Sequence, residues 1–538
     1  MSAILKHEGV IVREQEVIDL IGREAYAKMK KQFVKTVKLP HNKFKSHRLV
    51  IECNNTKPNG TKEKVLIVKR FLGFKWLECK YLNSITNKIT CDDYTPIGSW
   101  NIALPLYPIQ QTLHDELLKT YLTPERAAAG NAGTILELEA GMGKTFVAAH
   151  VAASLKKRTL YVVLNEFLMD QAIADFEKVL PGVAIGKYYS RKKSWGDIMF
   201  IIVNSINSKE FVIDKITYTP TAFFAQFGLT IWDEIHEYCT PRGADAFARA
   251  STPYMLGITA EANGRTDKMD FIAHMSCGAP FYSDRFEPYT NLMDVRDETW
   301  TSKCQIIKYI GPPSHTQTLK CETTQMMMMS RMVRQIIQDP YRFQLLLNYA
   351  IDFYKAGKNF FIWTDMQQVV RILTEALAAY GILAEAPEIG SNTAPLMGGG
   401  TRIEAAGRVQ AAQNARVIVA TYQYACRGVS LPQFDAMIFA TPRRAKMYQT
   451  LKRIFRLGSD VSITREVIDI VDEGTKLKAQ LTDRRREYNK KEIFNMTIEV
   501  SKCYHIEITL DPNIVQILNN AVQTHMQPEH IIDSIELN

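Results

Sequence analysis

A chain of 538 residues is longer than one hydrophobic core usually supports, so we expect two or three domains. Its composition, 46% hydrophobic and 23% charged, is that of a globular protein, and no apolar run reaches the roughly 18 to 20 residues needed to cross a bilayer. The start of the chain lacks a signal-peptide pattern, and the nine cysteines stand singly, without the spacing of a zinc or iron–sulfur site. These features argue against a membrane-spanning, secreted or cysteine-ligated metalloprotein.

The basic residues are concentrated at the N-terminus. Residues 1–90 hold 19 Lys or Arg and 8 Asp or Glu, a net charge of +11, against +9 for the whole chain. Because such charge neutralises phosphates, we predict that residues 1–99 form an accessory domain that grips nucleic acid. The interleaved apolar and basic residues of VLIVKRFLGFKWLECKY favour a folded module over a disordered tail. A solvated lysine-rich surface and a docking site for a protein partner are the alternatives.

Short, continuous apolar runs begin after the turn-rich stretch TPIGSW, which indicates a domain boundary near residue 100. Continuous runs are typical of strands buried on both faces, hence of a parallel sheet covered by helices. We therefore predict an α/β domain over residues 100–279. Its expected strands are residues 134–138, 159–164, 198–203, 229–233 and 254–259.

A phosphate-binding loop is predicted directly after the first of these strands, before a helical pattern. The loop consists of Gly141, Met142, Gly143, Lys144 and Thr145. In such a loop the glycines let backbone N–H groups approach phosphate oxygens, the lysine neutralises the β and γ charges, and the hydroxyl binds Mg²⁺. A glycine-rich turn without a ligand is the alternative.

Two acids stand at the end of another expected strand, LTIWD. An aspartate placed like Asp233 is suited to hold Mg²⁺, and the adjacent Glu234 is suited to polarise the water that attacks the γ-phosphate. Without a P-loop, these acids would be interpreted as a solvated loop. With one, they indicate an NTPase.

The same architecture then repeats. Residues 280–325 contain several prolines and glycines without a clear period, so we expect an interdomain linker there. A second α/β domain is predicted over residues 326–495, and residues 496–538 are expected to form a C-terminal tail. The expected strands of the second domain are residues 359–363, 415–420, 435–440 and 466–471.

Two arginines near the end of this second domain, Arg453 and Arg456, are three residues apart, so we expect them on one face of a helix. An arginine supplied by a second domain stabilises the transition state of hydrolysis only when the two domains close, which couples hydrolysis to motion. A small-molecule kinase, which also uses a P-loop, is disfavoured by the second strand series and by this pair.

In their order along the chain, these motifs resemble those of superfamily 2 helicases of the DExH type, over residues 100–490. The resemblance implies two tandem RecA-like P-loop domains with parallel sheets, here preceded by a smaller basic domain, and an ATP-dependent helicase that uses ATP and Mg²⁺. The stretches that carry the resemblance are LYPIQQ, EAGMGKT, YVVLNEFLMDQ, DEIH, GITAEA, FFIWTD, VIVATYQYACRGVSLPQFD and QTLKRIFR.

The resemblance also implies roles for single residues. Gln110 would recognise adenine, and residues 141–145 would bind the phosphates. Glu234, Arg453 and Arg456 would be catalytic, and Thr145 and Asp233 would hold Mg²⁺. The residues expected to couple ATP to nucleic acid are His236, Thr259 and Gln449, and those expected to bind nucleic acid are Thr364, Thr421, Arg427 and Gly428.

Three positions depart from the family pattern. Leu138 takes the outer glycine position of the general P-loop pattern. Glu261 follows Thr-Ala where helicases usually have a threonine, and Lys452 stands where a glycine usually precedes the first arginine. The last two changes leave every expected ATP contact in place, so coupling could change while hydrolysis persists. A nucleic-acid-binding scaffold with a vestigial motor is therefore an alternative of another class.

Within the superfamily, longer stretches resemble helicases of large cytoplasmic DNA viruses, namely the poxvirus transcript-release helicase and asfarvirus helicases. They are FFAQFGLTIWDEIHEY, GITAEANGRTDKMD, IFATPRRAKMYQTLKRIFRLGSD and DRRREYNKK. This implies a monomer, without a membrane partner, that acts on DNA in transcript release or in repair and recombination. Its expected place is the cytoplasmic viral factory or the virion, and its expected protein partners are the viral RNA polymerase or other transcription factors. An RNA helicase is the alternative, since the DExH tetrad occurs in both groups.

Overall fold

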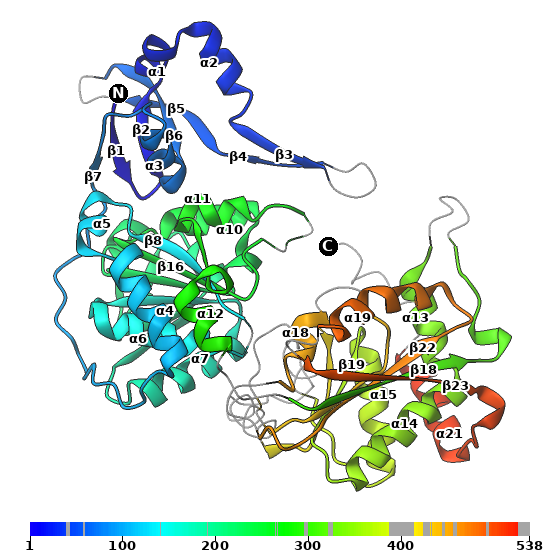
Figure 1. Ribbon diagram of the computed structural model, residues 1–538. Helices are drawn as coiled ribbons and strands as arrows, with labels where there is room; N and C mark the ends of the chain where they lie inside the picture. The colour runs from blue at the N-terminus through cyan, green and yellow to red at the C-terminus, as the bar shows by residue number, and fades with distance from the viewer. Residues whose placement is uncertain are drawn as a thin grey trace. The chain divides into compact units, whose positions relative to one another are not determined.

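The computed structural model resolves the chain into two compact units, Met1–Val295 and Arg296–Asn538, each of which is considered by itself (Figure 1). The residues that the structure describes are 1–38, 44–56, 60–139, 141–190, 192–263, 265, 267–294, 300–320, 327–386, 414–422, 431, 433–443, 447–455, 460–490 and 494–525.

The first unit begins with a small module built on a five-stranded sheet of order β5-β6-β2-β1-β7. Alternate side chains of β1 are buried, because one face of the sheet packs on helices and on the module's own apolar core. This confirms a folded, strand-containing module. Its sheet and helices are β1 (Ser2–Lys6), β2 (Gly9–Arg13), β5 (Val50–Thr56), β6 (Lys62–Val68), β7 (Ser84–Asn87), α1 (Glu14–Ile21), α2 (Arg23–Lys30) and α3 (Arg70–Glu78).

A two-stranded hairpin, β3 (Val34–Lys38) and β4 (Phe44–Arg48), extends away from this sheet (Figure 1). The strands pair antiparallel, with Val34 opposite Arg48 and Lys38 opposite Phe44. Its base is continuous with the module, because the Leu49 N–H donates to the Phe33 carbonyl at 2.7 Å. We call residues 34–38 and 44–48 the basic ribbon.

Arg70, the first residue of α3, ties the N-terminal module to the rest of the unit. Its side chain is buried, and its guanidinium donates to the carbonyl oxygens of Gly130 (2.8 Å), Thr252 (2.7 Å) and Pro253 (3.1 Å). Burial lowers the pKa of Arg70 to about 10. Since α3 also packs against α11 (Phe271–Cys277), the first 99 residues have their own core but belong to one compact unit with the domain that follows.

Replacing Arg70 by methionine should reduce the free energy of unfolding of the first unit by at least about 3 kcal/mol, because three buried carbonyl oxygens lose a charged donor. The measurement is urea unfolding, with limited proteolysis to follow release of the module. Lys75→Met is the matched control, since Lys75 lies on the same helix with its side chain exposed. Equal stability of the two variants would show that Arg70 does not anchor the module.

The remainder of the first unit is an eight-stranded sheet of order β11-β10-β12-β9-β15-β16-β8-β17, with helices on both sides (Figure 1). Every strand except β11 pairs in parallel, as the continuous apolar runs predict, and all five expected strands occur. The strands are β8 (Gly133–Glu137), β9 (Thr159–Val163), β10 (Ile185–Tyr189), β11 (Lys192–Ser194), β12 (Ile198–Ile202), β15 (Leu229–Asp233), β16 (Tyr254–Thr259) and β17 (Pro280–Tyr282).

Helices connect these strands, and several begin at side-chain caps. The Asn165 side chain accepts from the Leu168 N–H at the start of α7, and the Thr240 hydroxyl accepts from the Gly243 N–H at the start of α10. The helices are α4 (Pro108–Glu116), α5 (Pro124–Ala129), α6 (Lys144–Leu155), α7 (Glu166–Val179), α8 (Val203–Ile206), α9 (Pro220–Phe224), α10 (Pro241–Arg249), α11 and α12 (Glu287–Asp294), and β13 (Phe211–Ile213) pairs with β14 (Ile216–Tyr218).

The second unit is a six-stranded, all-parallel sheet of order β20-β19-β21-β22-β18-β23. The four expected strands occur within one residue or two of their predicted bounds. The strands and helices are β18 (Ser302–Ile310), β19 (Phe360–Thr364), β20 (Val417–Thr421), β21 (Ala436–Phe439), β22 (Arg465–Asp472), β23 (Met496–Tyr504), α13 (Met329–Ile337), α14 (Pro340–Lys355), α15 (Gln367–Ala379), α18 (Met447–Leu451), α19 (Leu481–Tyr488) and α21 (Pro512–His525).

Two expected segments differ in the structure. Residues 280–325 are not a linker throughout, because β17 pairs with β8 in the first sheet and β18 lies within the second sheet. Residues 496–538 are not simply a tail, because β23 pairs with β18 and α21 places Ile514 and Leu518 in the core of the second unit. Prolines and glycines near β17 and β18 hid their short apolar patterns, whereas β23 is exposed along most of its length and has no continuous apolar run. Within the described part of the chain, no helix is long and apolar enough to cross a membrane.

Candidate nucleotide-binding site

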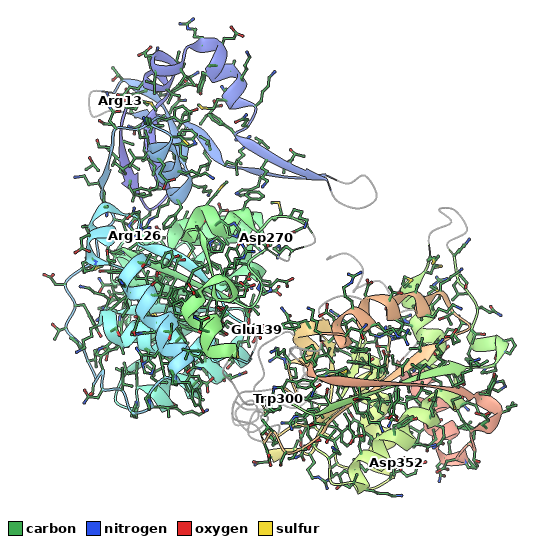
Figure 2. The ribbon with its side chains drawn as sticks, in the orientation of Figure 1. Arg13, Arg126, Glu139, Asp270, Trp300 and Asp352 are labelled. Atoms are coloured by element: carbon green, nitrogen blue, oxygen red, sulfur yellow. The ribbon has the colours of Figure 1, made fainter. Side chains whose placement is uncertain are left out.

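The predicted phosphate-binding loop lies between β8 and α6, which begins at Lys144. Gly141 and Gly143 have φ values of 87° and 78°, a left-handed conformation that glycine adopts without the steric cost of a side chain. Glu139, labelled in Figure 2, precedes the loop, and its carbonyl accepts from the Met142 N–H at 3.3 Å. The N-terminus of α6 therefore opens from the loop, and backbone N–H groups at the start of a helix favour an anion.

Gln110, on α4, lies directly against this loop. Its side-chain amide donates to the Met142 carbonyl at 2.9 Å and accepts from the Tyr107 N–H at 3.1 Å. A Cβ atom at Gly143 would stand 2.2 Å from the Gln110 Nε2, so a larger residue there would displace the Gln110 side chain. The structure thus places Gln110 beside the loop, and its expected contact with adenine stays a prediction.

Lys144 and Glu234 face each other across the site. The Lys144 Nζ lies 3.6 Å from the Glu234 Oε1 and 3.4 Å from the Leu138 carbonyl oxygen. Their side chains are 10% and 15% exposed, so solvent screens this ion pair only partly. Glu234 has a φ of 46°, so the chain turns sharply as β15 ends and directs the carboxylate back to the loop.

Asp233, the last residue of β15, lies beside the same groups. Burial, with the neighbouring Glu234 carboxylate, raises the pKa of Asp233 to about 7, and the Lys144 ammonium opposes this rise. Burial and the Asp233 carboxylate also raise the pKa of Tyr161, on β9, whose hydroxyl adjoins the Thr145 hydroxyl. The Tyr161 hydroxyl therefore lies beside both Thr145 and Asp233.

This donor set fits Mg²⁺. Magnesium in nucleotide sites is held by one or two protein oxygens together with phosphate oxygens and water, and Thr145 and Asp233 supply one hydroxyl and one carboxylate. Among the described residues no group of three or more His, Cys, Asp or Glu side chains could hold a metal. One hydroxyl and one carboxylate suit a metal that arrives with a polyphosphate.

The expected coupling residues of the first unit also meet. The His236 Nδ1 lies 2.8 Å from the Thr259 hydroxyl, which is 3.5 Å from the Glu234 Oε2. The Thr259 hydroxyl also accepts from the backbone N–H of Glu261 at 3.1 Å, so the unusual glutamate keeps the local turn with its backbone. The ends of β15 and β16 are thus joined through side chains around Glu234.

The second unit differs from expectation at the arginine pair. Helix α18 ends at Leu451, and Arg453 lies in the following turn, where its N–H donates to the Thr450 carbonyl at 3.1 Å. Arg453 therefore does not lie on a helix, contrary to the expectation that it shares one helical face with Arg456. Gln449 and Arg453 are both buried, and the Lys452 ammonium lies 5.6 Å from the centre of the Tyr448 ring, which gives this lysine a packing role in place of the usual glycine.

The expected nucleic-acid contacts are only partly placed. Thr364, at the end of β19, has no exposed surface, and Thr421, at the end of β20, is 5% exposed. Both residues are buried within the second unit, which does not support direct contact with nucleic acid. In a sheet covered by helices, even polar residues at strand ends can be buried. Arg427, Gly428 and Arg456 lie outside the described residues.

Two residues at the site were missed from the sequence. Tyr161 lies within a continuous apolar run, and its pattern alone indicates core packing. The Arg265 Nη1 donates to the His236 carbonyl at 2.8 Å, and the guanidinium pairs with Asp267 at 2.8 Å, so Arg265 holds the chain after Glu234. The sequence GRTDKMD shows an arginine close to an aspartate, which suggests an ion pair. The contact of Arg265 with the His236 carbonyl depends on the fold and could not be predicted from the sequence.

A P-loop and an acidic strand end in one parallel-sheet unit, followed by a second parallel-sheet unit, define a superfamily 2 helicase motor with two RecA-like domains. The family model described as "Type III restriction enzyme, res subunit" matches residues 103–263. A protein of African swine fever virus (isolate Tick/Malawi/Lil 20-1/1983), QP509L, is 30% identical over 406 residues, which cover 72% of this chain and 73% of that protein, and its name assigns it to ATP-dependent RNA helicases.

The mimivirus protein L396, also named as an ATP-dependent RNA helicase, is 25% identical over 441 residues, covering 80% of this chain and 75% of the relative. Among solved structures, T4 UvsW is 15% identical and covers 93% of this chain and 99% of that one, with a TM-score of 0.32. The chain belongs to the family of ATP-dependent helicases of large DNA viruses that includes QP509L. The resemblance to asfarvirus helicases is thereby confirmed.

Proposed function

We propose that the site between β8 and β15 hydrolyses ATP with Mg²⁺ to drive movement along nucleic acid. The observation that carries this proposal is the convergence of Lys144, Glu234 and Asp233 on one glycine loop, with 3.6 Å between the lysine and the glutamate. Lys144 would exchange this partner for the phosphates, and Glu234 would then orient the attacking water and accept its proton. Thr145 and Asp233 would hold Mg²⁺, which neutralises the charge that develops on the phosphates.

The second unit would supply the arginine that completes the reaction. Arg453 is our candidate, with Arg456 as the other member of the expected pair. Its planar, permanently charged group would stabilise the transferred phosphoryl in the transition state, and this requires the two units to close. The contacts of Glu234 with Thr259, and of Thr259 with His236, would transmit the state of the γ-phosphate, together with Gln449. Arg427 and Gly428 would contact the nucleic acid.

We further propose DNA as the nucleic acid, and transcript release or DNA repair and recombination as the process, in the viral factory of the host cytoplasm. The basic N-terminal module supports binding to a phosphate backbone, and viral RNA polymerase or another transcription factor would be its protein partner. An RNA substrate is the second candidate, because QP509L and L396 are both named as RNA helicases.

An ATPase assay across nucleic acids tests these proposals. We expect turnover by the full chain to be stimulated by duplex or single-stranded DNA more strongly than by RNA, since bound nucleic acid favours the closed, hydrolysing state. Stronger stimulation by RNA would select the RNA helicase. A chain that binds nucleic acid but shows no turnover with any of them would instead be the scaffold with a vestigial motor.

A further inference from the structure

The basic ribbon concentrates the charge of the N-terminal module. Its two strands, residues 34–38 and 44–48, contain Lys35, Lys38, Lys45 and Arg48 and no acidic residue. Elsewhere in the module several cations are already paired: Arg13 lies 2.9 Å from Glu16, and Lys30 and Glu52 form an ion pair. Neither Lys35 nor Arg48 forms an ion pair with another described residue.

One face of the ribbon is fixed to the eight-stranded α/β part of the first unit, which we call the motor domain. Opposite residues of an antiparallel pair share a face, so Lys35 and His47 project together. The Lys35 Nζ lies 4.1 Å from the centre of the Phe271 ring on α11, and the His47 ring is centred 6.1 Å from the same ring. Leu49, at the ribbon's base, packs against the cores of both the module and the motor domain. A ribbon that would be marginal in isolation is thereby held in place.

The opposite face is free. Val34 is 42% exposed, and Thr36, Ser46 and Arg48 on the same face are exposed. The Thr36 and Ser46 hydroxyls lie 2.9 Å apart across the strands. This face therefore presents hydroxyl groups and a guanidinium. Such groups donate hydrogen bonds to phosphate oxygens and to base edges.

A cavity of about 450 Å³ adjoins the base of the ribbon, between the sheet of the module and α10. Its walls include Lys69 from the module and Arg242 and Arg249 from α10, with Asp245 and Glu8 as the acids. The ribbon and the cavity are contiguous, because the N–H of Lys69, a wall of the cavity, donates to the carbonyl of Leu49 at the ribbon's base at 3.4 Å. The charge of Lys69 also adds to burial in lowering the pKa of His47. Cations from the N-terminal module and from α10 thus continue the basic surface of the ribbon along the motor domain.

We propose that the free face of the basic ribbon enters the major groove of B-form DNA, so that the module grips duplex DNA. A two-stranded ribbon fits that groove, which is about 12 Å wide, whereas the deep, narrow major groove of an RNA duplex excludes it. A single strand has no groove to enter. This inference rests on the proposed function, because it names the form of nucleic acid that the motor holds.

The test removes two cations of the basic ribbon in the full chain, with Lys38→Gln at the end of β3 and Arg48→Gln on the free face. Binding is measured by fluorescence anisotropy, without ATP, on a DNA duplex, an RNA duplex of the same sequence and single-stranded DNA at several salt concentrations. Each phosphate contact contributes about 0.9 to the slope of log affinity against log salt on B-form DNA. We expect the slope to fall by up to about 1.8 on duplex DNA and to stay unchanged on the other two nucleic acids.

Two further variants make the result specific. Lys62→Gln with Lys64→Gln removes equal charge from the far end of β6, where Lys62 pairs with Thr56, and should leave the slope unchanged. Lys38→Arg with Arg48→Lys keeps the charge and should keep the slope. Thermal melting checks the fold, and Arg48→Gln alone, with an expected loss of about 0.9, serves if the double variant is unfolded.

An unchanged slope on duplex DNA, as expected if the ribbon docks an acidic protein, would overturn the proposal. An equal loss on all three nucleic acids would also overturn it, because it would show a general attraction to phosphate without groove binding. Since binding is read without ATP, these outcomes leave hydrolysis untouched. Absence of any ATPase activity in the wild-type chain would instead contradict the proposed function.

Discussion

Glu234→Gln should reduce ATP turnover to background while leaving ATP affinity within a few-fold of the wild type. The amide keeps the size and shape of the carboxylate but cannot accept a proton from the attacking water, so the loss falls on the chemical step. The variant also removes the charge that lies 3.6 Å from Lys144, which frees the lysine for the phosphates and preserves binding. Single-turnover hydrolysis and equilibrium binding of a fluorescent ATP analogue separate the two effects.

Lys144→Ala is the complementary change. It should abolish hydrolysis and weaken ATP binding together, because the ammonium would contact the β- and γ-phosphates already in the ground state. Glu177→Gln is a matched control, since Glu177 lies exposed on α7 in the same unit. Its turnover should stay near that of the wild type. Turnover of Glu234→Gln near the wild-type value would reject Glu234 as the base.

Arg453→Ala should lower kcat by roughly 10³ or more, if Arg453 is the arginine that meets the γ-phosphate in the closed state. ATP binding by the first unit should survive, because Lys144, Thr145 and Asp233 all lie within that unit. The measurements are steady-state ATPase with saturating nucleic acid and equilibrium binding of ATP. Arg453→Lys keeps the charge without the planar fork, so it should recover only a small part of the rate.

Arg453 is buried, so its loss could also weaken the second unit. Thermal melting of the variant distinguishes these effects, because a folded variant with low kcat assigns the residue to chemistry. Arg331→Ala provides the control, since Arg331 lies exposed on α13 in the same unit. Normal hydrolysis by both Arg453→Ala and Arg456→Ala would contradict a site shared by two units.

The parts of the structure that follow from local sequence were predictable. A buried strand, a glycine loop and a helix are consecutive around Gly143, so position along the chain predicts position in space. The same holds for Asp233 and Glu234 at the end of β15. Strands such as β12 and β20 were detected because both of their faces are buried, and their sequences are therefore continuously apolar.

The parts that depend on distant neighbours were not predictable. The basic ribbon has too few apolar residues for a strand pattern, and its stability comes from Leu49 and Phe271. Strand β23 is exposed along most of its length, so it lacks the apolar run that marks a buried strand. The interpretation of Thr364 as a nucleic-acid contact came from family resemblance, which gives no information on whether a side chain at a strand end is covered.

The position of β18 has a consequence for synthesis on the ribosome. β18 is the first strand of the second unit, yet its partners on both sides, β22 and β23, come from residues 465–472 and 496–504. A nascent chain therefore holds β18 without either neighbour until more than 150 further residues have emerged. The first unit, whose sheet ends with β17 at Tyr282, completes its fold much earlier. The P-loop half of the motor is thus assembled while the other half still has an unpaired strand, and a chaperone that shields apolar strands would act on β18 during that interval.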